Sequence, residues 1–463
     1  MQRTHALNVA QDVESLFHPY TPLDKVRETG PLVMTRGDGI YVEDDQGRRY
    51  LEAVSGLWCT SLGFSEQRLM DAAQQQFRQL PYYQLFGGRA NEPSIALSHA
   101  LIEKTRHLGM AMAMFANSGS EANDQAVKMV WYYFNAIGKP HKKKLIARER
   151  AYHGVTVMAA SLTGLAGNHA DFDLPIGDRV LRTASPSYYH YGRPGETEAQ
   201  FVDRIVGELE ALILREGADT IAAFFAEPVQ GAGGVIVPAA GYWEKVQALL
   251  RRHDILLVAD EVITGFGRTG EWFGCDTYGI QPDLMTVAKA LSSSYLPISA
   301  TLVSARVYEG LTQGSRRNGQ FAHGVTYAGH PVCAAVALET LRIYEERDIV
   351  GHVRRVAPHF QRRLRGMEQH PMVHASRGVG LIGAIELVQD KATGRTFEAG
   401  SPILARVVSA GFEVGLICRA LRDTLAVSPP LIITEPQIDE LFDKMGQSLD
   451  LALADARAAG LMP

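Results

Sequence analysis

The stretch Ile255-Leu-Leu-Val-Ala-Asp260 is an apolar run that ends in a carboxylate, and Leu284-Met-Thr-Val-Ala-Lys289 is a second run that ends in an amine. Runs of this length, nearly free of polar residues and separated by a loop or a helix, are typical of buried parallel strands. In open α/β sheets, ligands bind outside the carboxyl ends of such strands. Asp260 and Lys289 are therefore predicted to lie at a functional site. The alternative is a buried ion pair that only supports the fold.

An acid and an amine at strand ends suit the cofactor pyridoxal phosphate. This cofactor needs a lysine for its Schiff base and a carboxylate that keeps its pyridine nitrogen protonated. Lys289 is predicted to be that catalytic lysine, and Asp260 is predicted to be that carboxylate. The two runs alone do not separate this interpretation from a structural ion pair, because a short motif is weak evidence.

A possible phosphate site lies earlier in the chain, where Met114-Phe-Ala runs into Asn117-Ser-Gly-Ser120 and then into a helical pattern. Ser118 or Ser120 can cap this helix. Free backbone N–H groups at a helix start bind anions, and a glycine allows close approach. A cofactor phosphate is therefore expected on Gly119 and Ser120. The alternative is an ordinary capped helix.

Three further residues are candidates for the surroundings of a cofactor ring. Tyr152 can cover one face of the ring and Val262 the other. Successive strand residues alternate faces, so Asp260 and Val262 are expected to point the same way. Glu227 ends the apolar run Ile221-Ala-Ala-Phe-Phe-Ala and adds a carboxylate at another strand end. Each of these residues alone is as consistent with a core position.

Together these segments resemble the class III pyridoxal-phosphate aminotransferases of fold type I. The matching motifs are Asn-Ser-Gly-Ser-Glu-Ala-Asn at 117–123, Tyr-His-Gly at 152–154, Ala-Glu-Pro-Val at 226–229, Asp-Glu-Val with Gly-Phe-Gly-Arg-Thr-Gly at 260–270, Lys289, and His-Gly-Val-Thr-Tyr-Ala-Gly-His-Pro at 323–331. The ordered set is far more specific than any one motif. The resemblance adds His153 and Gly154 to the expected cofactor site. It also implies that Thr326 binds the cofactor phosphate of a partner subunit.

Other segments are similar to the omega-transaminase branch, the amine–pyruvate enzymes. They are His-Pro-Tyr-Thr at 18–21, Ser-Gly-Leu-Trp-Cys at 55–59, and Leu-Ile-Cys-Arg at 416–419 followed by Ser-Pro-Pro-Leu-Ile-Ile-Thr at 428–434. By this resemblance the substrate pocket is lined by Tyr20, Leu57, Trp58, Phe86, Tyr152 and Val155, and Arg419 receives the substrate carboxylate.

The chain departs from that branch at two positions. Val325 stands where the branch often has phenylalanine, which leaves the substrate size open. Arg422 stands where it often has glycine, in the loop that carries Arg419. Arg422 is therefore a rival ligand for the carboxylate. A surface ion pair between Arg419 and Asp423 is a further alternative.

Composition places the chain among ordinary soluble enzymes. It has 463 residues, 46% hydrophobic and 21% charged, with a net charge of −5. This length predicts at least two domains. No basic stripe or zinc pattern occurs, so neither nucleic acid nor a metal is an expected partner. No apolar run is long enough to span a bilayer. The scattered cysteines are expected to be reduced, in a cytoplasmic protein; they are Cys59, Cys275, Cys333 and Cys418.

The predicted fold class is α/β. Residues 60–325 alternate strand-like and helix-like segments and are expected to form a large cofactor-binding domain with a mostly parallel sheet flanked by helices. Helical patterns follow at 333–347 and 349–367, with strands expected near 380–387 and 425–427, and a last helix from about Thr434. The resemblance implies that residues 1–59 and 326–463 join as one smaller α+β domain.

The predicted function is ping-pong transamination between a small-molecule amine donor and a keto acid. Lys289 would hold the cofactor and move a proton, while Asp260 would keep the ring nitrogen charged. A primary amine or ω-amino acid would pass its amino group to pyruvate, giving alanine. The resemblance implies a homodimer with shared active sites, which could pair further into a tetramer.

Three alternatives remain. The first is another class III reaction: an ornithine- or 4-aminobutyrate-type transaminase, an aminomutase or a decarboxylating transaminase. The second is a nicotinamide oxidoreductase, which would have a similar sheet, although no Gly-x-Gly-x-x-Gly joins a strand and a helix near the N-terminus. The third is a protein that binds ligands without catalysis.

Overall fold

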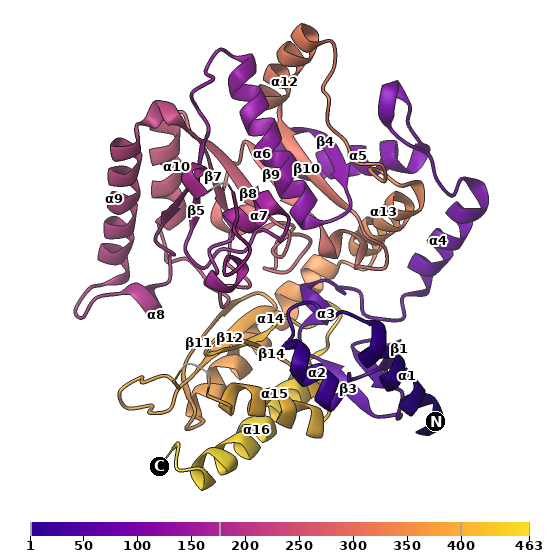
Figure 1. The fold of residues 1–463 in the computed structure, drawn as a ribbon, viewed down its shortest axis with the longest axis vertical. Coiled ribbons are helices and arrows are strands. Elements are labelled where there is room, and N and C mark those ends of the chain that lie inside the picture. Colours follow the sequence, from indigo (N-terminus) through magenta and orange to yellow (C-terminus); the bar gives the residue numbers. More distant parts are fainter. Residues whose placement is uncertain (1, 176, 399–400, 463) are drawn as a thin grey trace.

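The computed structural model describes residues 2–175, 177–398 and 401–462. Its centre is a seven-stranded sheet with the order β4-β10-β9-β8-β7-β5-β6 (Figure 1). The strands are β4 (Met110–Ala116), β5 (Lys144–Arg148), β6 (Val180–Thr183), β7 (Ile221–Ala226), β8 (Leu256–Asp260), β9 (Leu284–Val287) and β10 (Ser299–Ser304). The β6–β5, β5–β7, β7–β8 and β8–β9 pairs are parallel, and β10 is antiparallel to β4 and β9. The expectation of a mostly parallel sheet is confirmed.

Both faces of this sheet are buried. In β7, Phe225 belongs to a core cluster with Val130 of the helix α6 (Gly119–Ala136). Its neighbour Phe224 belongs to another cluster, with Val246 of α10 (Tyr242–Arg252). Successive strand residues point to opposite faces, so strands covered by helices on both sides are apolar throughout. The remaining helices between residues 60 and 350 are α4 (Gln67–Gln79), α5 (Glu92–Thr105), α7 (Val157–Leu162), α8 (Tyr188–Tyr191), α9 (Glu198–Glu216), α11 (Gly274–Tyr278), α12 (Ala305–Asn318) and α13 (Pro331–Glu346).

Two smaller sheets lie in the lower half of Figure 1, where the indigo N-terminal and yellow C-terminal segments meet. The strand orders are β1-β2-β3-β13 and β11-β12-β15-β14. Their strands are β1 (Met34–Asp38), β2 (Tyr41–Asp44), β3 (Arg49–Glu52), β11 (Val373–Val379), β12 (Ile382–Leu387), β13 (Leu416–Ile417), β14 (Arg419–Leu421) and β15 (Thr424–Val427). The parallel β3–β13 pair ties residue 51 to residue 416. The boundaries at residues 59/60 and 325/326 stay predictions.

Three of the four C-terminal helices agree with the sequence pattern, and the helix at residues 403–413 was not predicted. The four are α13, α14 (Ile349–Gly366), α15 (Ile403–Glu413) and α16 (Glu435–Ala458), while α1 (Gln2–Ser15), α2 (Leu23–Thr29) and α3 (Ser55–Trp58) lie at the other end of the chain. Thr434 begins α16 through a capping box with Gln437, and a proline follows in the first turn. None of the helices within the described residues is long and apolar enough to cross a bilayer.

Candidate active site

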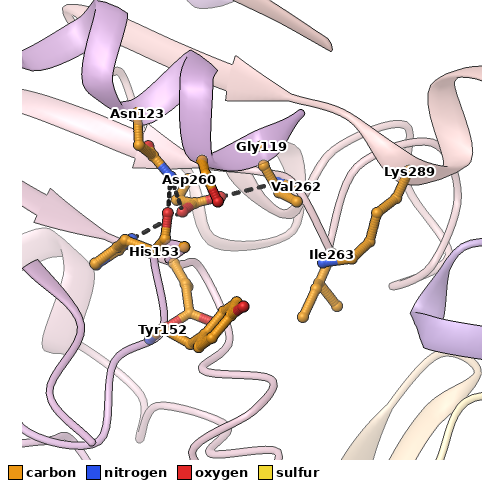
Figure 2. A pocket seen from close by; sticks show the side chains of 11 residues that line it. Gly119, Asn123, Tyr152, His153, Asp260, Val262, Ile263 and Lys289 are labelled. Carbon is orange, nitrogen blue, oxygen red and sulfur yellow. Dashed lines mark hydrogen bonds and ion pairs between the residues drawn. The ribbon is translucent and has the colours of Figure 1, made fainter. Parts of the chain in front are cut away.

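The strands of the central sheet bring most of the predicted cofactor residues to one pocket, with a volume of about 180 Å³ (Figure 2). Tyr152 follows β5, Glu227 follows β7, Asp260 ends β8, and Lys289 follows β9. Because these strands are parallel, their carboxyl ends meet at one edge of the sheet. The pocket is lined by Gly119, Ser120, Asn123, Tyr152, His153, Gly154, Glu227, Asp260, Val262, Ile263 and Lys289. Ser118 and Thr326 are the predicted cofactor residues outside this lining.

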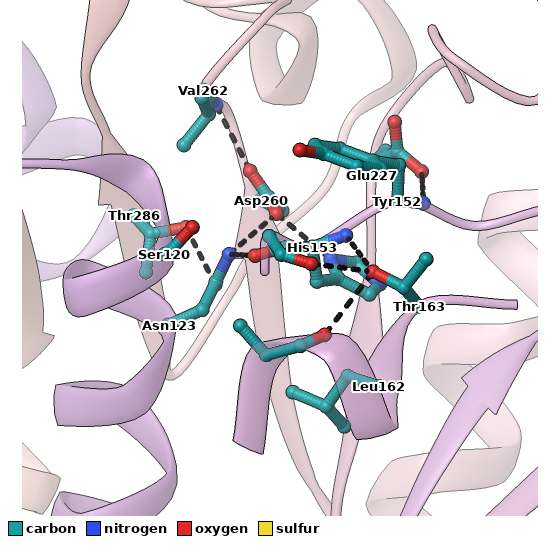
Figure 3. A network of polar contacts seen from close by, with 12 residues as sticks. Ser120, Asn123, Tyr152, His153, Leu162, Thr163, Glu227, Asp260, Val262 and Thr286 are labelled. Atoms are coloured by element: carbon teal, nitrogen blue, oxygen red, sulfur yellow. Dashed lines mark hydrogen bonds and ion pairs between the residues drawn. The ribbon is translucent and has the colours of Figure 1, made fainter. Parts of the chain in front are cut away.

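Asp260 is the centre of a buried hydrogen-bond network (Figure 3). Its Oδ2 lies 2.8 Å from His153 Nδ1 and accepts a hydrogen bond of 2.8 Å from Asn123 Nδ2. Thr286 Oγ1 donates to Asn123 Oδ1 over 3.1 Å and so orients the amide. Asp260 is only 3% exposed, so these donors replace water around its carboxylate. The network holds an anion in a fixed position at the pocket wall.

Asn123 was not among the predicted site residues. It lies four residues after Gly119, one turn further along the same face of α6. That spacing, inside the 117–123 motif, is the signal that could have identified it. Asn123 also donates to the His153 carbonyl over 2.7 Å, so one amide ties the Tyr-His-Gly segment to Asp260.

The geometric reason given above for Val262 is wrong. Strand β8 ends at Asp260, so alternation of faces does not extend to Val262. Instead the Val262 N–H donates to Asp260 Oδ1 over 3.1 Å in a tight turn, and the turn places the side chain at the pocket. A Cβ atom at Gly119 would lie 3.0 Å from Val262 Cγ1, so the glycine allows α6 to approach this turn.

The start of α6 can hold a phosphate. Ser118 is the N-cap, and its side chain accepts from the Glu121 N–H over 3.2 Å. Ser120 Oγ accepts from the Val155 N–H over 3.1 Å. Within residues 2–175, 177–398 and 401–462, the N–H groups of Gly119 and Ser120 have no protein partner. They are therefore free to bind an anion beside the helix N-terminus. Gly154 packs so closely here that an added Cβ would lie 2.4 Å from Ser120 Oγ.

Lys289 lies two residues beyond the end of β9, at the start of the short helix η6 (Lys289–Ser292), with φ of 50°. In Figure 2 it stands on the side of the pocket opposite Asn123 and His153. Burial lowers its pKa, and the negative charge of Asp260 opposes that change only in part. In the described part of the chain Lys289 forms no ion pair with Asp260. The alternative of a buried ion pair that only supports the fold is therefore wrong.

Glu227 positions the walls of the pocket. Its Oε1 accepts from the Tyr152 N–H over 3.0 Å, and its Oε2 accepts from the Gly231 N–H over 2.9 Å. Burial raises the pKa of Glu227. The carboxyl group therefore links the loop after β5 to the loop after β7.

A larger cavity of about 550 Å³ opens beside the first, and Tyr152, Ile263 and Lys289 line both. We call it the substrate cavity. Its other lining residues are Pro19, Tyr20, Leu57, Trp58, Leu165, Gly167, Asn168, Ala232, Gly233, Arg419, Ala420, Leu421 and Arg422. Of the predicted substrate residues, Phe86 and Val155 do not line it. Both side chains are exposed on this chain, as is Thr326.

Arg419 contributes a positive charge to this cavity. The side chain is half-buried, and burial lowers its pKa. Among the described residues it has no ion pair and no hydrogen-bond partner, so the surface pair with Asp423 is not formed. Arg422 lines the same cavity at the turn that follows β14.

Comparison with known proteins agrees with this geometry. The profile of the family described as aminotransferase class-III matches residues 24–449. Gamma aminobutyrate transaminase 1, mitochondrial, of Solanum lycopersicum is 48% identical over 434 residues, which cover 94% of this chain and 84% of that protein. The crystal structure of the omega transaminase from Pseudomonas jessenii in complex with PMP has a TM-score of 0.95 and 48% identity, over 98% of this chain and 99% of that one. A transaminase with L-alanine has a TM-score of 0.88 and 52% identity, over 92% of this chain and 100% of that one.

Family profile, sequence relatives and solved structures thus agree with a pocket built from a lysine, a buried carboxylate and an anion-binding helix start. The chain belongs to the class III aminotransferases, the pyridoxal-phosphate enzymes of fold type I.

Proposed function

We propose that this aminotransferase moves the amino group of a primary amine or an ω-amino acid to pyruvate, which gives alanine. The observation that carries this proposal is the unpaired Arg419 in a cavity otherwise walled by Tyr20, Leu57, Trp58 and Tyr152. Such a cavity offers an apolar surface for an amine side chain and a cation, Arg419, for a carboxylate. The similarity to a transaminase with L-alanine supports the choice of pyruvate.

In this proposal the residues at the carboxyl ends of the strands hold the cofactor. Gly119 and Ser120 would bind its phosphate through their backbone N–H groups. Asp260 would pair with the protonated ring nitrogen, and Tyr152 and Val262 would lie against the ring. When bound, pyridoxal phosphate withdraws electrons from the carbon that carries the amino group.

Lys289 is proposed to be the catalytic base and acid. Burial lowers the pKa of Lys289, which makes it easier for Nζ to give up a proton and take it back. It also lies at the junction of the two cavities, within reach of groups bound in either. Tyr152 and Ile263 also line both cavities and would help to exclude water from this junction.

Arg419 is proposed to bind the carboxylate of pyruvate or alanine. A guanidinium group forks a carboxylate with two parallel hydrogen bonds. An apolar amine leaves that charge unpaired, which is costly if the arginine stays inside. Because no described residue anchors Arg419, the side chain is free to turn toward solvent in that half-reaction.

The assembly proposed is a homodimer with shared sites, and a tetramer would consist of two such dimers. Thr326, Phe86 and Val155 are exposed and line neither the cofactor pocket nor the substrate cavity of their own chain, which fits residues that act at the site of a partner. A cytoplasmic location is also proposed, since all four cysteines are unpaired.

The second candidate is a 4-aminobutyrate transaminase. It is favoured by the 48% identity to the gamma aminobutyrate transaminase of Solanum lycopersicum. A spectrum separates these candidates. The visible absorbance of the holoenzyme should be bleached by an arylalkylamine and by alanine, and restored by pyruvate. Bleaching by 4-aminobutyrate but not by the amine, with recovery only by another keto acid, supports the second candidate.

A further inference from the structure

Two arginine side chains of the substrate cavity have no ion-pair or hydrogen-bond partner among the described residues. Arg419 begins β14, and Arg422 lies in the turn between β14 and β15 with φ of 55°. Both line the cavity. Within the described ranges neither has an ion pair or a side-chain hydrogen bond, although Asp423 is adjacent. The cavity therefore contains two arginine cations that are available to a ligand, whereas one arginine is enough to bind a single carboxylate.

The two cations lie toward different ends of the cavity. The charge of Arg419 lowers the pKa of Lys289 further than burial alone does, so its guanidinium lies on the lysine side. Burial lowers the pKa of Arg150, and the positive charge of Arg422 lowers it further, so the Arg422 guanidinium lies on the Arg150 side. Arg419 is half-buried and Arg422 is exposed, so Arg422 lies at the rim.

The region around Arg422 favours an anion. Arg150 has a buried Nη1 atom without a described partner, and its carbonyl lies directly behind the cavity wall, 2.2 Å from where a Cβ on Gly233 would stand. The buried Glu386 does not neutralise this region, because it is paired with Arg377 over 2.6 Å and lies 3.2 Å from His190.

We propose that Arg422 forms a second anion subsite, which binds the distal carboxylate of an extended ω-amino acid while its amine lies at Lys289. Arg419 would serve carboxylates close to the reacting carbon, as in pyruvate and alanine. This inference rests on the proposed function and names the donor class that suits it: long ω-amino acids in preference to alkylamines of the same length.

The test compares 6-aminohexanoate with hexylamine, which has the same chain and no carboxylate. Each donor, and alanine, is reacted with holoenzyme of the wild type, Arg422→Ala, Arg422→Lys and Arg419→Ala, and kcat/KM is measured. A lost hydrogen bond between charged groups corresponds to a fall of about 10- to 100-fold. We expect that fall for 6-aminohexanoate in Arg422→Ala, with hexylamine and alanine within about twofold of the wild type. The Arg422→Lys variant should recover part of the loss.

Three results would each overturn the inference. Arg422→Ala could lower kcat/KM equally for 6-aminohexanoate and hexylamine, or only Arg419→Ala could lower it for 6-aminohexanoate. The third result is a wild type whose kcat/KM for 6-aminohexanoate is no higher than for hexylamine. A wild type that reacts with none of the three donors would instead overturn the proposed function.

Binding of hexanoate, which cannot react, supplies a second measurement by calorimetry on the holoenzyme. Arg422→Ala should weaken hexanoate and leave neutral hexanamide unchanged. The control is Arg316→Ala, which removes one positive charge from the exposed end of α12, well away from β14 in Figure 1. An equal weakening in the control would show a general charge effect and overturn the subsite.

Discussion

The wall of the cofactor pocket and the rim of the substrate cavity hold charge in opposite ways. At the wall, Asp260 is buried and receives hydrogen bonds from Asn123 and Val262, with His153 Nδ1 at 2.8 Å. In the substrate cavity, Arg422 at the rim and Arg419 on the lysine side form no ion pair with any described residue, and both are partly exposed to solvent. A fixed anion suits one invariant cofactor, whereas free cations suit substrates that differ in charge. The difference teaches that charged groups are held in fixed positions in the pocket whose ligand, the cofactor, is always the same.

Loss of the anion at the wall should have the largest effect. Asp260→Asn keeps the shape but cannot pair with a cation in a dry site, which costs several kcal/mol of transition-state stabilisation. Turnover should fall about 1000-fold or more, with the cofactor still bound. The matched control is Asp283→Asn, just before the first residue of β9, where the carboxylate accepts from the Leu257 N–H over 2.9 Å and lies 3.9 Å from Arg306 Nη1. Near-normal turnover of Asp260→Asn would rule out its proposed role.

Removal of the cation near the lysine should have the next largest effect, and only on acids. Arg419→Ala should lower kcat/KM for pyruvate and alanine by about 100-fold, because a forked carboxylate contact is lost. An arylalkylamine should react within about threefold of the wild-type rate. Similar losses for acid and amine would show that Arg419 supports the cavity as a whole and does not discriminate between substrates.

Weakening of the support around Asp260 should have a moderate effect on every substrate. Asn123→Ala removes a donor to Asp260 and leaves Thr286 without its acceptor, a cost of about 1–3 kcal/mol. Turnover should fall about tenfold for amines and acids alike. Steady-state assays with both donors check this. A loss of turnover with only one class of donor would contradict the account in which the cofactor pocket serves every substrate and the substrate cavity discriminates between them.

The smallest effect on activity is expected at Glu52, beneath the loop that carries Leu57 and Trp58. Glu52 is 5% exposed and accepts from the N–H groups of Val54 and Gly56. Burial raises its pKa to about 7 from the usual 4.5, so the folded chain binds an extra proton between these values. Its contribution to stability is therefore present below about pH 4.5 and lost as pH rises through 7, worth about 3 kcal/mol at most.

Glu52→Gln should remove this dependence of the free energy of unfolding on pH. Thermal unfolding of the two proteins at pH 5 and pH 8 measures it as a difference of about a few degrees in Tm. Turnover on all donors should stay within about threefold of the wild type. Parallel pH profiles for the two proteins would show that Glu52 stays ionised throughout.

Apolar runs predicted the buried strands well, because strands covered on both faces have no polar positions and the pattern is unambiguous. They also located Asp260 and Lys289, since parallel strands end at a common edge. They did not predict the end of β8 at Asp260, where the Val262 N–H turns back to the carboxylate. The spacing from Gly119 places Asn123 on the same face of α6, but its bond to Asp260 depends on how α6 packs against β8, and for this reason the residue was missed.

The substrate cavity was harder to predict than the cofactor pocket. Tyr20 and Trp58 come from N-terminal segments and Arg419 from a C-terminal segment, and the contacts that join these segments include the β3–β13 pair. Resemblance supplied these residues, and spacing could not have done so. Phe86, Val155 and Thr326 line neither cavity of this chain. Their predicted roles depend on the assembly and stay predictions.

Reduction of the holoenzyme with borohydride, followed by peptide mapping, tests most directly whether Lys289 is the residue that binds the cofactor. We expect one labelled peptide, and it should contain Lys289. Lys289→Ala should show no label and no multiple turnover. A label on another lysine, such as Lys142, whose Nζ donates to the Ile221 carbonyl over 2.9 Å, would contradict the proposed site.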